Sequence, residues 1–318
     1  MFNRILVPLD QSPIAECVLP HLVAFAKVYD AHLTLIHVME CPTAANRLQP
    51  IDPLSWQLCK SEAEAYLNDV VNRLSEAGLE TEPVLLEGQP AQTIIEYAQS
   101  NAINLIMMSS HGRTGMSRWN VNSVVRKIIQ ESLISTAVIR AYNPFVEKLE
   151  RLQYRRILVP LDGSLRSECV LPTAATLTET HQASLLLAHV VVKPEMPRQT
   201  PLNQDDLDLI QSFVDRNLRA ANDYFKRLLA RLGADFVPRL LVSENIAISL
   251  HQLVEDEAVD LVVISAHGYS GHAKWPYGSL TTSFIEYGTT PLLIVQDLAP
   301  GEIALSEAQA AAQQVKGH

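Results

Sequence analysis

Two glycines and a serine in the last third of the chain have the spacing of a phosphate-binding loop. Gly268 is followed by nine residues and then by Gly278 and Ser279, and a helical pattern begins at Leu280. Glycine lets a ligand approach backbone N–H groups closely, and a helix N-terminus attracts anions through its unpaired N–H groups and its dipole. The spacing therefore predicts a site for phosphate groups at the start of this helix.

Aspartates and histidines recur at the ends of apolar runs. Asp10 and Asp162 each follow the residues Ile-Leu-Val-Pro-Leu, and His37 and His189 each close a second apolar run. An aspartate at the end of a strand lies where ligands of open parallel sheets bind, but it also caps turns in proteins without ligands. Both interpretations stand for the aspartates. For the two histidines we favour a hydrogen-bonded structural role.

Two further histidines, His111 and His267, directly precede the candidate glycines Gly112 and Gly268. They are placed to donate hydrogen bonds to a ligand, and a role in a surface loop is an equal alternative. The glycines also have a second explanation, because a tight turn from strand to helix favours glycine whatever binds there.

The two halves of the chain are copies of one another. Residues 4–20 and 156–172 match without a gap at 13 of 17 positions, at an offset of 152, and Ser109-Ser110-His111-Gly112 meets Ser265-Ala266-His267-Gly268 at an offset of 156. Tandem duplication explains this match. The 318 residues have room for two domains of about 150 residues. We place the domains at 1–143 and 154–298, followed by a tail at 299–318.

Short β-branched or leucine-rich runs alternate with longer helical patterns in each copy. This alternation is typical of an open parallel sheet with helices on both faces, whose ligands bind beyond the carboxyl ends of the strands. The longest helices are expected at about 56–77 and 205–232. The strands are expected at about 4–9, 32–38, 81–86, 104–109 and 136–141 in the first copy, and at about 156–161, 184–192, 236–242, 260–265 and 291–296 in the second.

A proline lies inside the first predicted helix of each copy. Ser12 and Ser164 have the type and position of helix N-caps, and Pro20 and Pro172 follow within the same pattern. Proline removes one helical hydrogen bond and clashes with the preceding turn. We therefore expect a kink at both prolines, with termination of the helix as the alternative.

At these residues the sequence resembles the universal stress protein family, and the resemblance spans both copies almost completely. Nucleotide-binding members of that family carry G-x-x-G, nine residues and then G-[ST], together with an aspartate after the first strand. Gly268, Gly278 and Ser279 match this pattern in the second copy, where Ser265 replaces the opening glycine. The resemblance thus implies an adenine nucleotide site in the second copy.

The first copy matches the family pattern less well. Only Gly112 and Ser123 match, because Ser109 replaces the opening glycine and Asn122 replaces the later one. Asparagine tolerates a positive φ better than most residues, so Asn122 is expected to preserve the turn. Its side chain fills space that a phosphate needs, and we therefore expect nucleotide more in the second copy.

The resemblance also implies the fold and the assembly. It implies an α/β, Rossmann-like fold similar to that of the adenine-nucleotide alpha hydrolases, with two tandem five-stranded parallel sheets in the order 3-2-1-4-5. Family members form dimers in which the fifth strands pair. The chain would form an intramolecular pseudo-dimer of this kind, with Val138-Ile139 beside Leu293-Ile294. A homodimer of the whole chain is a further option.

The resemblance assigns a role to each site residue by its position. Asp162 would contact the ribose or a Mg²⁺ ion bound to ATP, and the backbone at Val190 would face the adenine. The N–H groups of Gly268, Gly278 and Ser279 would meet the phosphates. The full set of candidates is Pro160, Asp162, Val190, Ser265, Gly268, Gly278, Ser279 and Leu280 in the second copy and, more weakly, Pro8, Asp10, Val38, Gly112, Asn122 and Ser123 in the first.

Three functions fit these features. The leading one is an ATP-binding stress-response sensor or switch, in which nucleotide stabilises the loop between Gly268 and Gly278 and changes a partner surface. The second is a structural or interaction protein that has lost nucleotide binding, because Ser109, Ser265 and Asn122 replace expected glycines. The third is a slow ATPase or a nucleotidyl transferase. No Walker A motif or nucleophile–base set supports the third, so no catalytic residue is assigned.

The composition argues against several other classes of protein. A formal net charge of −10 opposes the phosphate backbone of nucleic acids. The longest apolar stretches, such as 185–192, are shorter than the roughly 20 residues that cross a bilayer. The N-terminus shows no secretion signal, and the four cysteines form no CxxC pair. We therefore expect a cytoplasmic protein with buried thiols and without nucleic-acid or membrane partners.

Overall fold

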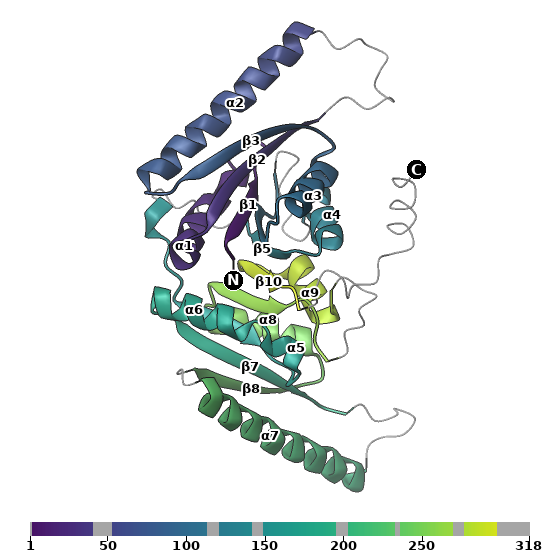
Figure 1. Ribbon diagram of the computed structural model, residues 1–318. Helices are drawn as coiled ribbons and strands as arrows, with labels where there is room; N and C mark the ends of the chain where they lie inside the picture. Colours follow the sequence, from purple (N-terminus) through teal and green to yellow (C-terminus); the bar gives the residue numbers. More distant parts are fainter. Residues whose placement is uncertain are drawn as a thin grey trace. The chain divides into compact units, whose positions relative to one another are not determined.

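The chain forms two compact units, Met1–Gln153 and Tyr154–His318, and each contains an α/β fold (Figure 1). The computed structural model describes residues 2–40, 53–112, 121–141, 149–194, 203–232, 236–269 and 277–297. The predicted tail at 299–318 lies outside these ranges. Each unit has five parallel strands, as the sequence predicted.

Unit 1 has the strand order β3-β2-β1-β4-β5. Helices α3 and α4 cover one face of its sheet, and α1 and α2 lie on the other (Figure 1). The strands are β1 (Arg4–Pro8), β2 (His32–Glu40), β3 (Thr81–Gly88), β4 (Leu105–Ser109) and β5 (Ser135–Ile139). The helices are η1 (Ala15–Val18), α1 (Leu19–Tyr29), α2 (Pro53–Glu76), α3 (Pro90–Ser100), α4 (Ser123–Ser132) and η3 (Leu149–Arg151).

Unit 2 repeats this topology in the order β8-β7-β6-β9-β10. The duplication read from the sequence is therefore a duplication of the fold. Its strands are β6 (Arg156–Pro160), β7 (Ser184–Val192), β8 (Val237–Ser243), β9 (Leu261–Ser265) and β10 (Leu292–Val295). Its helices are α5 (Leu165–Glu168), α6 (Leu171–His181), α7 (Gln204–Leu232), α8 (Ile246–Asp256) and α9 (Ser279–Tyr287).

The central strands of each sheet consist mainly of apolar residues. In β4 and β9 every residue is buried, and the Ile, Leu and Val residues of β1 and β6 are buried as well, as expected for strands covered by helices on both faces. In the register of the sheet, Ile5 lies opposite Leu33 and Leu105, and Ile157 lies opposite Leu185 and Leu261. This matched register brings the carboxyl ends of β1 and β4, and of β6 and β9, to one edge of each sheet.

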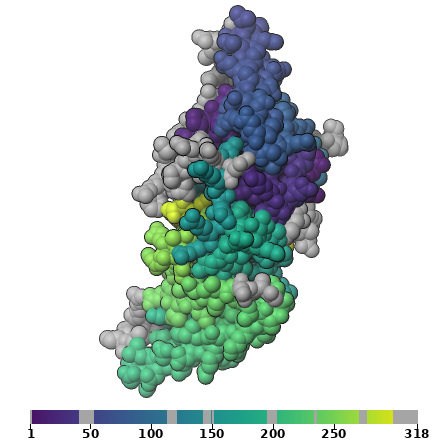
Figure 2. Space-filling view, turned by 90° about the vertical axis from the view of Figure 1, so that its left-hand side faces the viewer, coloured from purple at the N-terminus to yellow at the C-terminus, as the bar shows by residue number. Residues whose placement is uncertain are grey.

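The long helices α2 and α7 each bury a single stripe. In α7 the buried residues Val214, Ala221, Phe225 and Leu228 recur at helical spacing, and Ala63, Leu67, Val70 and Leu74 do so in α2. The blue side chains of α2 form part of the outer surface of unit 1 (Figure 2). No helix in the described ranges is both long and apolar enough to cross a membrane.

The prolines divide the first helix of each copy instead of kinking it. In unit 2, α5 ends at Glu168 and α6 begins at Leu171; in unit 1, η1 precedes α1, which begins at Leu19. Pro20 and Pro172 lie in the first turn of the second piece, where a missing N–H breaks no helical bond. The predicted kink within one continuous helix is therefore wrong.

Candidate functional site

Two loops meet at the carboxyl edge of the sheet in unit 2, the loop after β6 and the loop that connects β9 to α9. Gly268, after β9, lies so close to Asp162, after β6, that a Cβ atom on Gly268 would be 2.3 Å from Asp162 Oδ2. Gly278, at the start of α9, lies beside Gly268, because a Cβ atom there would be 3.9 Å from the Gly268 nitrogen. The structure thus brings Asp162 together with two glycines that lie far from it in the sequence.

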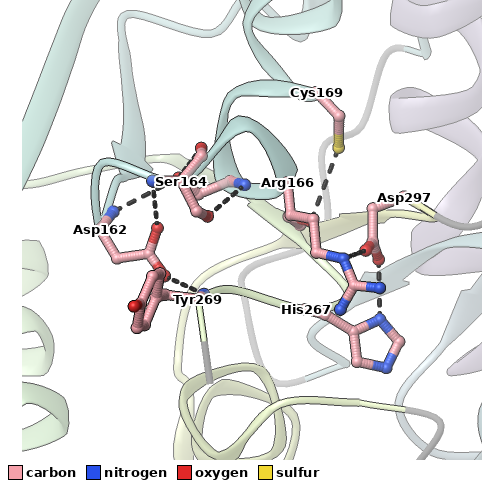
Figure 3. A network of polar contacts seen from close by, with 9 residues as sticks. Asp162, Ser164, Arg166, Cys169, His267, Tyr269 and Asp297 are labelled. Atoms are coloured by element: carbon pink, nitrogen blue, oxygen red, sulfur yellow. Dashed lines mark hydrogen bonds and ion pairs between the residues drawn. The ribbon is translucent and has the colours of Figure 1, made fainter. Parts of the chain in front are cut away.

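Asp162 joins these two loops through its carboxylate (Figure 3). Oδ1 accepts a hydrogen bond from the Ser164 nitrogen at 2.9 Å, and Oδ2 accepts one from the Tyr269 nitrogen at 2.5 Å. Burial alone would raise the pKa of this carboxyl, but hydrogen bonds from Ser164, Tyr269 and Ser167 outweigh burial and hold the pKa below its ordinary value. Asp162 is therefore an ionised acceptor at neutral pH.

Asp10 has the same position in unit 1. Its Oδ1 accepts hydrogen bonds from the Ser12 nitrogen at 3.1 Å and from Ser12 Oγ at 2.5 Å. A Cβ atom on Gly112 would lie 2.1 Å from Asp10 Oδ2. Neither Gly112 nor Gly268 has a positive φ. These two glycines are therefore required by the space beside an aspartate and not by the conformation of a tight turn.

The two units differ at the start of the helix that follows the fourth strand, α4 in unit 1 and α9 in unit 2. Gly278 precedes α9 with φ −69° and ψ 163° and offers no side-chain cap, whereas Asn122 precedes α4 with φ −55° and ψ 150°. Asn122 Oδ1 accepts hydrogen bonds from the Val124 nitrogen at 3.0 Å and from Ser123 Oγ at 3.2 Å. The expectation that Asn122 serves a turn of positive φ is wrong, because its function in the fold is to cap α4. The N-terminus of α9 has no such cap.

One predicted donor is already used within the protein. The Gly278 nitrogen donates to the Ala266 carbonyl at 2.8 Å, and the Asn122 nitrogen donates to the Ser110 carbonyl at 2.9 Å. The Gly278 N–H is therefore not free to meet a phosphate, contrary to the sequence prediction. The N–H groups of the first turn of α9, beginning with Ser279 and Leu280, have no acceptor within the helix.

The remaining candidates of unit 2 line the same edge of its sheet. Pro160 ends β6, Ser265 ends β9, and Val190 lies half-buried near the carboxyl end of β7. Leu280 lies in the first turn of α9. The Ser265 carbonyl accepts a hydrogen bond from Thr281 Oγ1 at 2.8 Å, which fixes the start of α9 against the end of β9.

His267 belongs to a buried network that sequence reasoning missed. Its Nδ1 lies 2.7 Å from Asp297 Oδ1, and Asp297 Oδ2 lies 3.5 Å from Arg166 Nε (Figure 3). His111 instead pairs through Nδ1 with Ser110 Oγ at 2.9 Å. The side chains of both histidines are buried, with His111 6% and His267 3% exposed, so a role in a surface loop is wrong.

His37 and His189 are hydrogen-bonded within the fold, as predicted. Nδ1 of His37 lies 2.7 Å from the Leu9 carbonyl, and Nδ1 of His189 lies 2.8 Å from the Leu161 carbonyl. The residues that follow these two carbonyls are the site aspartates. Each histidine thus braces an aspartate loop against the neighbouring strand.

Unit 1 contains a pocket of about 570 Å³ at the carboxyl edge of its sheet. Its apolar lining includes Met39, Ile94 and Met108, and its polar lining includes His111 and Ser109. All six candidates from the first copy line this pocket, namely Pro8, Asp10, Val38, Gly112, Asn122 and Ser123. The copy with the weaker match to the sequence pattern therefore contains a cavity at the predicted place.

A family model described as the universal stress protein family matches residues 1–140 and 153–296. The chain belongs to the universal stress protein family. A universal stress protein of Methanocaldococcus jannaschii is 28% identical over 141 residues, covering 44% of this chain and 83% of that protein. One of Mycobacterium tuberculosis is 22% identical over 270 residues, covering 83% of this chain and 87% of its own.

A solved structure confirms the fold of this universal stress protein. The crystal structure of a universal stress protein from Archaeoglobus fulgidus superimposes with a TM-score of 0.67 at 17% identity, over 94% of this chain and 100% of that one. The matches to the Mycobacterium tuberculosis protein and to the Archaeoglobus fulgidus structure both extend over more than one copy of the repeat. The tandem arrangement therefore occurs elsewhere in the family.

The three cysteines that the structure describes in this universal stress protein are free thiols. Cys17 Sγ lies 3.4 Å from Ser109 Oγ, and Cys169 Sγ lies 3.6 Å from Ser265 Oγ. Burial raises the pKa of both thiols, which makes them poor nucleophiles. Cys59 is exposed, so the expectation of buried thiols fails there. Cys41 lies outside the described residues.

No metal site is preformed by the side chains that the structure describes. Within the described ranges there is no group of three or more His, Cys, Asp or Glu residues able to hold an ion. Asp162 is a single carboxylate at the site. Because Mg²⁺ is bound in nucleotide sites by one or two carboxylates together with phosphate oxygens, Asp162 fits a Mg²⁺ ion only if a nucleotide brings it.

Proposed function

We propose that this universal stress protein binds ATP at the carboxyl ends of β6 and β9 in unit 2 and acts as a stress-response sensor or switch. The observation that carries the proposal is the uncapped N-terminus of α9, which lies beside Gly268 and Asp162. A helix N-terminus without a side-chain cap presents N–H groups and a positive dipole end to an anion. The phosphates would occupy this place.

The other groups at the edge suit the rest of the nucleotide. Asp162, ionised and exposed, can accept hydrogen bonds from ribose hydroxyls or contact a Mg²⁺ ion carried by the phosphates. The backbone at Val190, near the end of β7, would face the adenine. Because the net charge of the chain is −10, attraction of ATP depends on these local amides and dipoles and not on the overall field.

Tyr269 offers a way for nucleotide binding at Asp162 to change a surface that a partner protein contacts. Its nitrogen donates to Asp162, while its ring is 87% exposed (Figure 3). A nucleotide or ion that binds the Asp162 carboxylate would replace its hydrogen bond from the Tyr269 nitrogen. Tyr269 would then be released from this anchor. An exposed aromatic side chain whose backbone anchor depends on ligand is suited to a switch surface.

The substitution Gly278→Asn tests the proposal. The backbone of Gly278 matches that of Asn122, and a Cβ atom there meets its nearest neighbour, the Ala266 carbonyl oxygen, at an ordinary 3.6 Å. The asparagine side chain would cap α9 as Asn122 caps α4. We expect the affinity for ATP, measured by calorimetry with Mg²⁺, to fall at least about tenfold, as for the loss of one charged hydrogen bond.

Gly278→Ala is the matched control for this substitution. It adds the same Cβ atom without a capping oxygen, so it should bind ATP much as the natural chain does. Heat-denatured natural protein should also release adenine nucleotide, detected by HPLC of the supernatant. A supernatant without nucleotide, together with no heat of ATP binding, would contradict the proposal.

A second candidate is an interaction protein that binds no nucleotide. It is favoured by the hydrogen bonds of Asp10 and Asp162, because each carboxylate already accepts hydrogen bonds from the residues of its own turn. For such a protein, ATP and Mg²⁺ would leave the thermal midpoint unchanged. Ligand that binds only the native state would raise the midpoint.

A further inference from the structure

We propose that α7 of unit 2 is a dimerisation surface, at which two copies of the chain pair through their α7 helices in antiparallel orientation. α7 lies on the outer side of unit 2, beyond β7 and β8 (Figure 1). Three features of the helix support this assembly, namely an exposed apolar segment, a separation of charges along its length, and a large and a small residue on one face. The contact does not involve the proposed ATP site.

The first third of α7 carries apolar side chains that the fold leaves exposed. None of residues 204–213 is buried, and the buried stripe of the helix begins at Val214. Within these ten residues, however, Leu207 is 46%, Leu209 62% and Phe213 47% exposed. Exposed apolar side chains that gather on one segment indicate an interaction site, because a helical segment gains little stability in water without packing.

The charges of α7 are separated along its length. Residues 204–215 include four aspartates and no lysine or arginine, whereas residues 216–232 include five lysines or arginines and one aspartate. The helix dipole favours this order only within the first and last turns, so it does not account for Asp215, Arg216 and Arg219 in the middle. Two such helices in antiparallel orientation place each acidic half beside the basic half of the other copy.

The fold itself does not require this separation, because α2 occupies the same place in unit 1 without it. α2 has no acidic residue in its first turn, and its acidic and basic residues are mixed along the helix. At the offset of 158 between the two helices, Ser55 corresponds to Phe213 and Glu62 corresponds to Ala220. The apolar face and the charge pattern are therefore features of the second copy alone.

A large and a small side chain on one face give the register of the pair. Phe213 lies four residues after Leu209 and seven before Ala220, so the three residues share a face of α7 on which Ala220 is exposed. A two-fold axis midway between Phe213 and Ala220 places each phenyl ring opposite the small side chain of the other copy. The same axis places Asp206 opposite Arg227, once at each end of the contact.

One pair of helices makes a small interface. A helix of 29 residues is about 43 Å long, and two such helices bury less surface than a standard protein interface. Exposed ion pairs contribute little, so the contact of Phe213 supplies most of the affinity. We therefore expect a dissociation constant in the micromolar range that rises with ionic strength.

Sedimentation velocity of the full-length protein tests the assembly. Between about 1 and about 300 µM the natural chain should change from monomer to dimer. Phe213→Ser and Ala220→Glu, which each introduce the residue of the first copy, should raise the dissociation constant at least about tenfold. Because both residues are exposed, the thermal midpoint should change little. A natural chain that stays monomeric throughout this range would overturn the proposal.

Leu58→Arg in α2 is the matched control. Leu58 is 60% exposed and corresponds to Arg216, so the variant makes the reverse exchange between the copies in unit 1. It should leave the dissociation constant unchanged. Equal weakening by Leu58→Arg and Phe213→Ser would overturn the assignment of the contact to unit 2.

An exchange of charges tests the antiparallel orientation. Asp205→Lys is preferred to a change at Asp206, whose carboxylate also accepts a hydrogen bond from the Asn203 nitrogen. Asp205→Lys and Arg227→Glu should each dimerise at least about threefold more weakly than the natural chain, because like charges then meet at both ends of the pair. An equimolar mixture of the two variants should form heterodimers of natural strength, since opposite charges meet at both ends again. Heterodimers no stronger than the two homodimers would contradict antiparallel pairing.

The outcomes identify other origins of a dimer. A dimer that Phe213→Ser and Ala220→Glu both leave unchanged uses a different surface and overturns the proposal. Nucleotide is absent from all of these measurements, so failure of the assembly and failure of the proposed ATP function are separate results.

Discussion

His21 is a buried imidazole in α1 that makes the stability of unit 1 depend on pH. The residue is 9% exposed, and burial lowers its pKa from the ordinary 6.5 to about 4. Between these values the unfolded chain binds a proton that the native chain does not. The contribution of His21 to the free energy of unfolding is therefore complete above pH 6.5, and it is lost as the pH falls towards 4.

The duplicated chain supplies the control for this residue. Thr173 occupies the position of His21 in the second copy, directly after the same Leu-Pro pair, and is buried as well. We expect the natural chain to lose about 3 kcal/mol more than His21→Thr between pH 6.5 and pH 4, at about 1.4 kcal/mol per pH unit. Urea unfolding across this range measures the difference, and parallel pH profiles for the two proteins would contradict the prediction.

Residue spacing predicted the site better than it predicted the roles of single residues. The pairing of Asp162 with Gly268 followed from the order of strands and loops, and the structure confirms that they meet. The capping role of Asn122 was missed because a residue's φ cannot be read from its type alone. Asp297 was missed because Ala141 stands at its place in the first copy, so the repeat gave no signal.

At the scale of elements, a glutamate in each unit holds the long helix against the first helical segment. Glu168 accepts a hydrogen bond from Tyr224 Oη at 2.9 Å and pairs with Arg231, both in α7. In unit 1, Glu16 pairs with Arg73 of α2 at 2.8 Å. The sequence carried a signal for this contact, because the spacing Ala-x-x-Tyr followed by Arg-Leu recurs in both helices at an offset of 158.

The two tyrosines of this pattern should respond differently to removal of the hydroxyl. Tyr224→Phe removes a hydrogen bond to a carboxylate and should destabilise unit 2 by about 2 kcal/mol. Burial and the nearby charge of Glu16 raise the pKa of Tyr66, but Tyr66 Oη and Glu16 make no hydrogen bond of good geometry. Tyr66→Phe should therefore change the stability of unit 1 by less than about 0.5 kcal/mol.

Native-state hydrogen exchange of α7 and α2 amides measures the two effects separately. This separation matters because two units need not unfold in a single step. Equal losses of protection in the two helices would contradict the predicted difference between the tyrosines.

Regular elements were predictable because their patterns are local. The expected strands agree with β1 to β10 within about two residues at most ends, since continuous apolar runs identify buried parallel strands. The division of the first helix at Pro20 and Pro172 was not predictable in the same way. An apolar pattern continues across each proline, and only the packing decides whether the helix bends or restarts.

At the scale of the whole molecule, the duplication leaves each unit with two end strands. Within unit 1 the order ends at β3 and β5, and within unit 2 it ends at β8 and β10. An edge strand presents unpaired N–H and C=O groups, which other strands can satisfy. The family resemblance predicts that β5 and β10 pair with each other in a pseudo-dimer, while β3 and β8 remain edges.

Hydrogen exchange tests this prediction with internal controls. Successive residues of a parallel strand direct their N–H groups to opposite sides, so a true edge strand shows alternating fast and slow exchange. We expect alternating fast and slow exchange in β3 and β8. In β5 and β10 we expect uniformly slow exchange, with the outward amides at least about tenfold slower than those of β3 and β8. Alternation in β5 and β10 would contradict the pairing. Pairing within one chain should also survive dilution, whereas pairing between chains in a homodimer should lose its protection as the protein concentration falls.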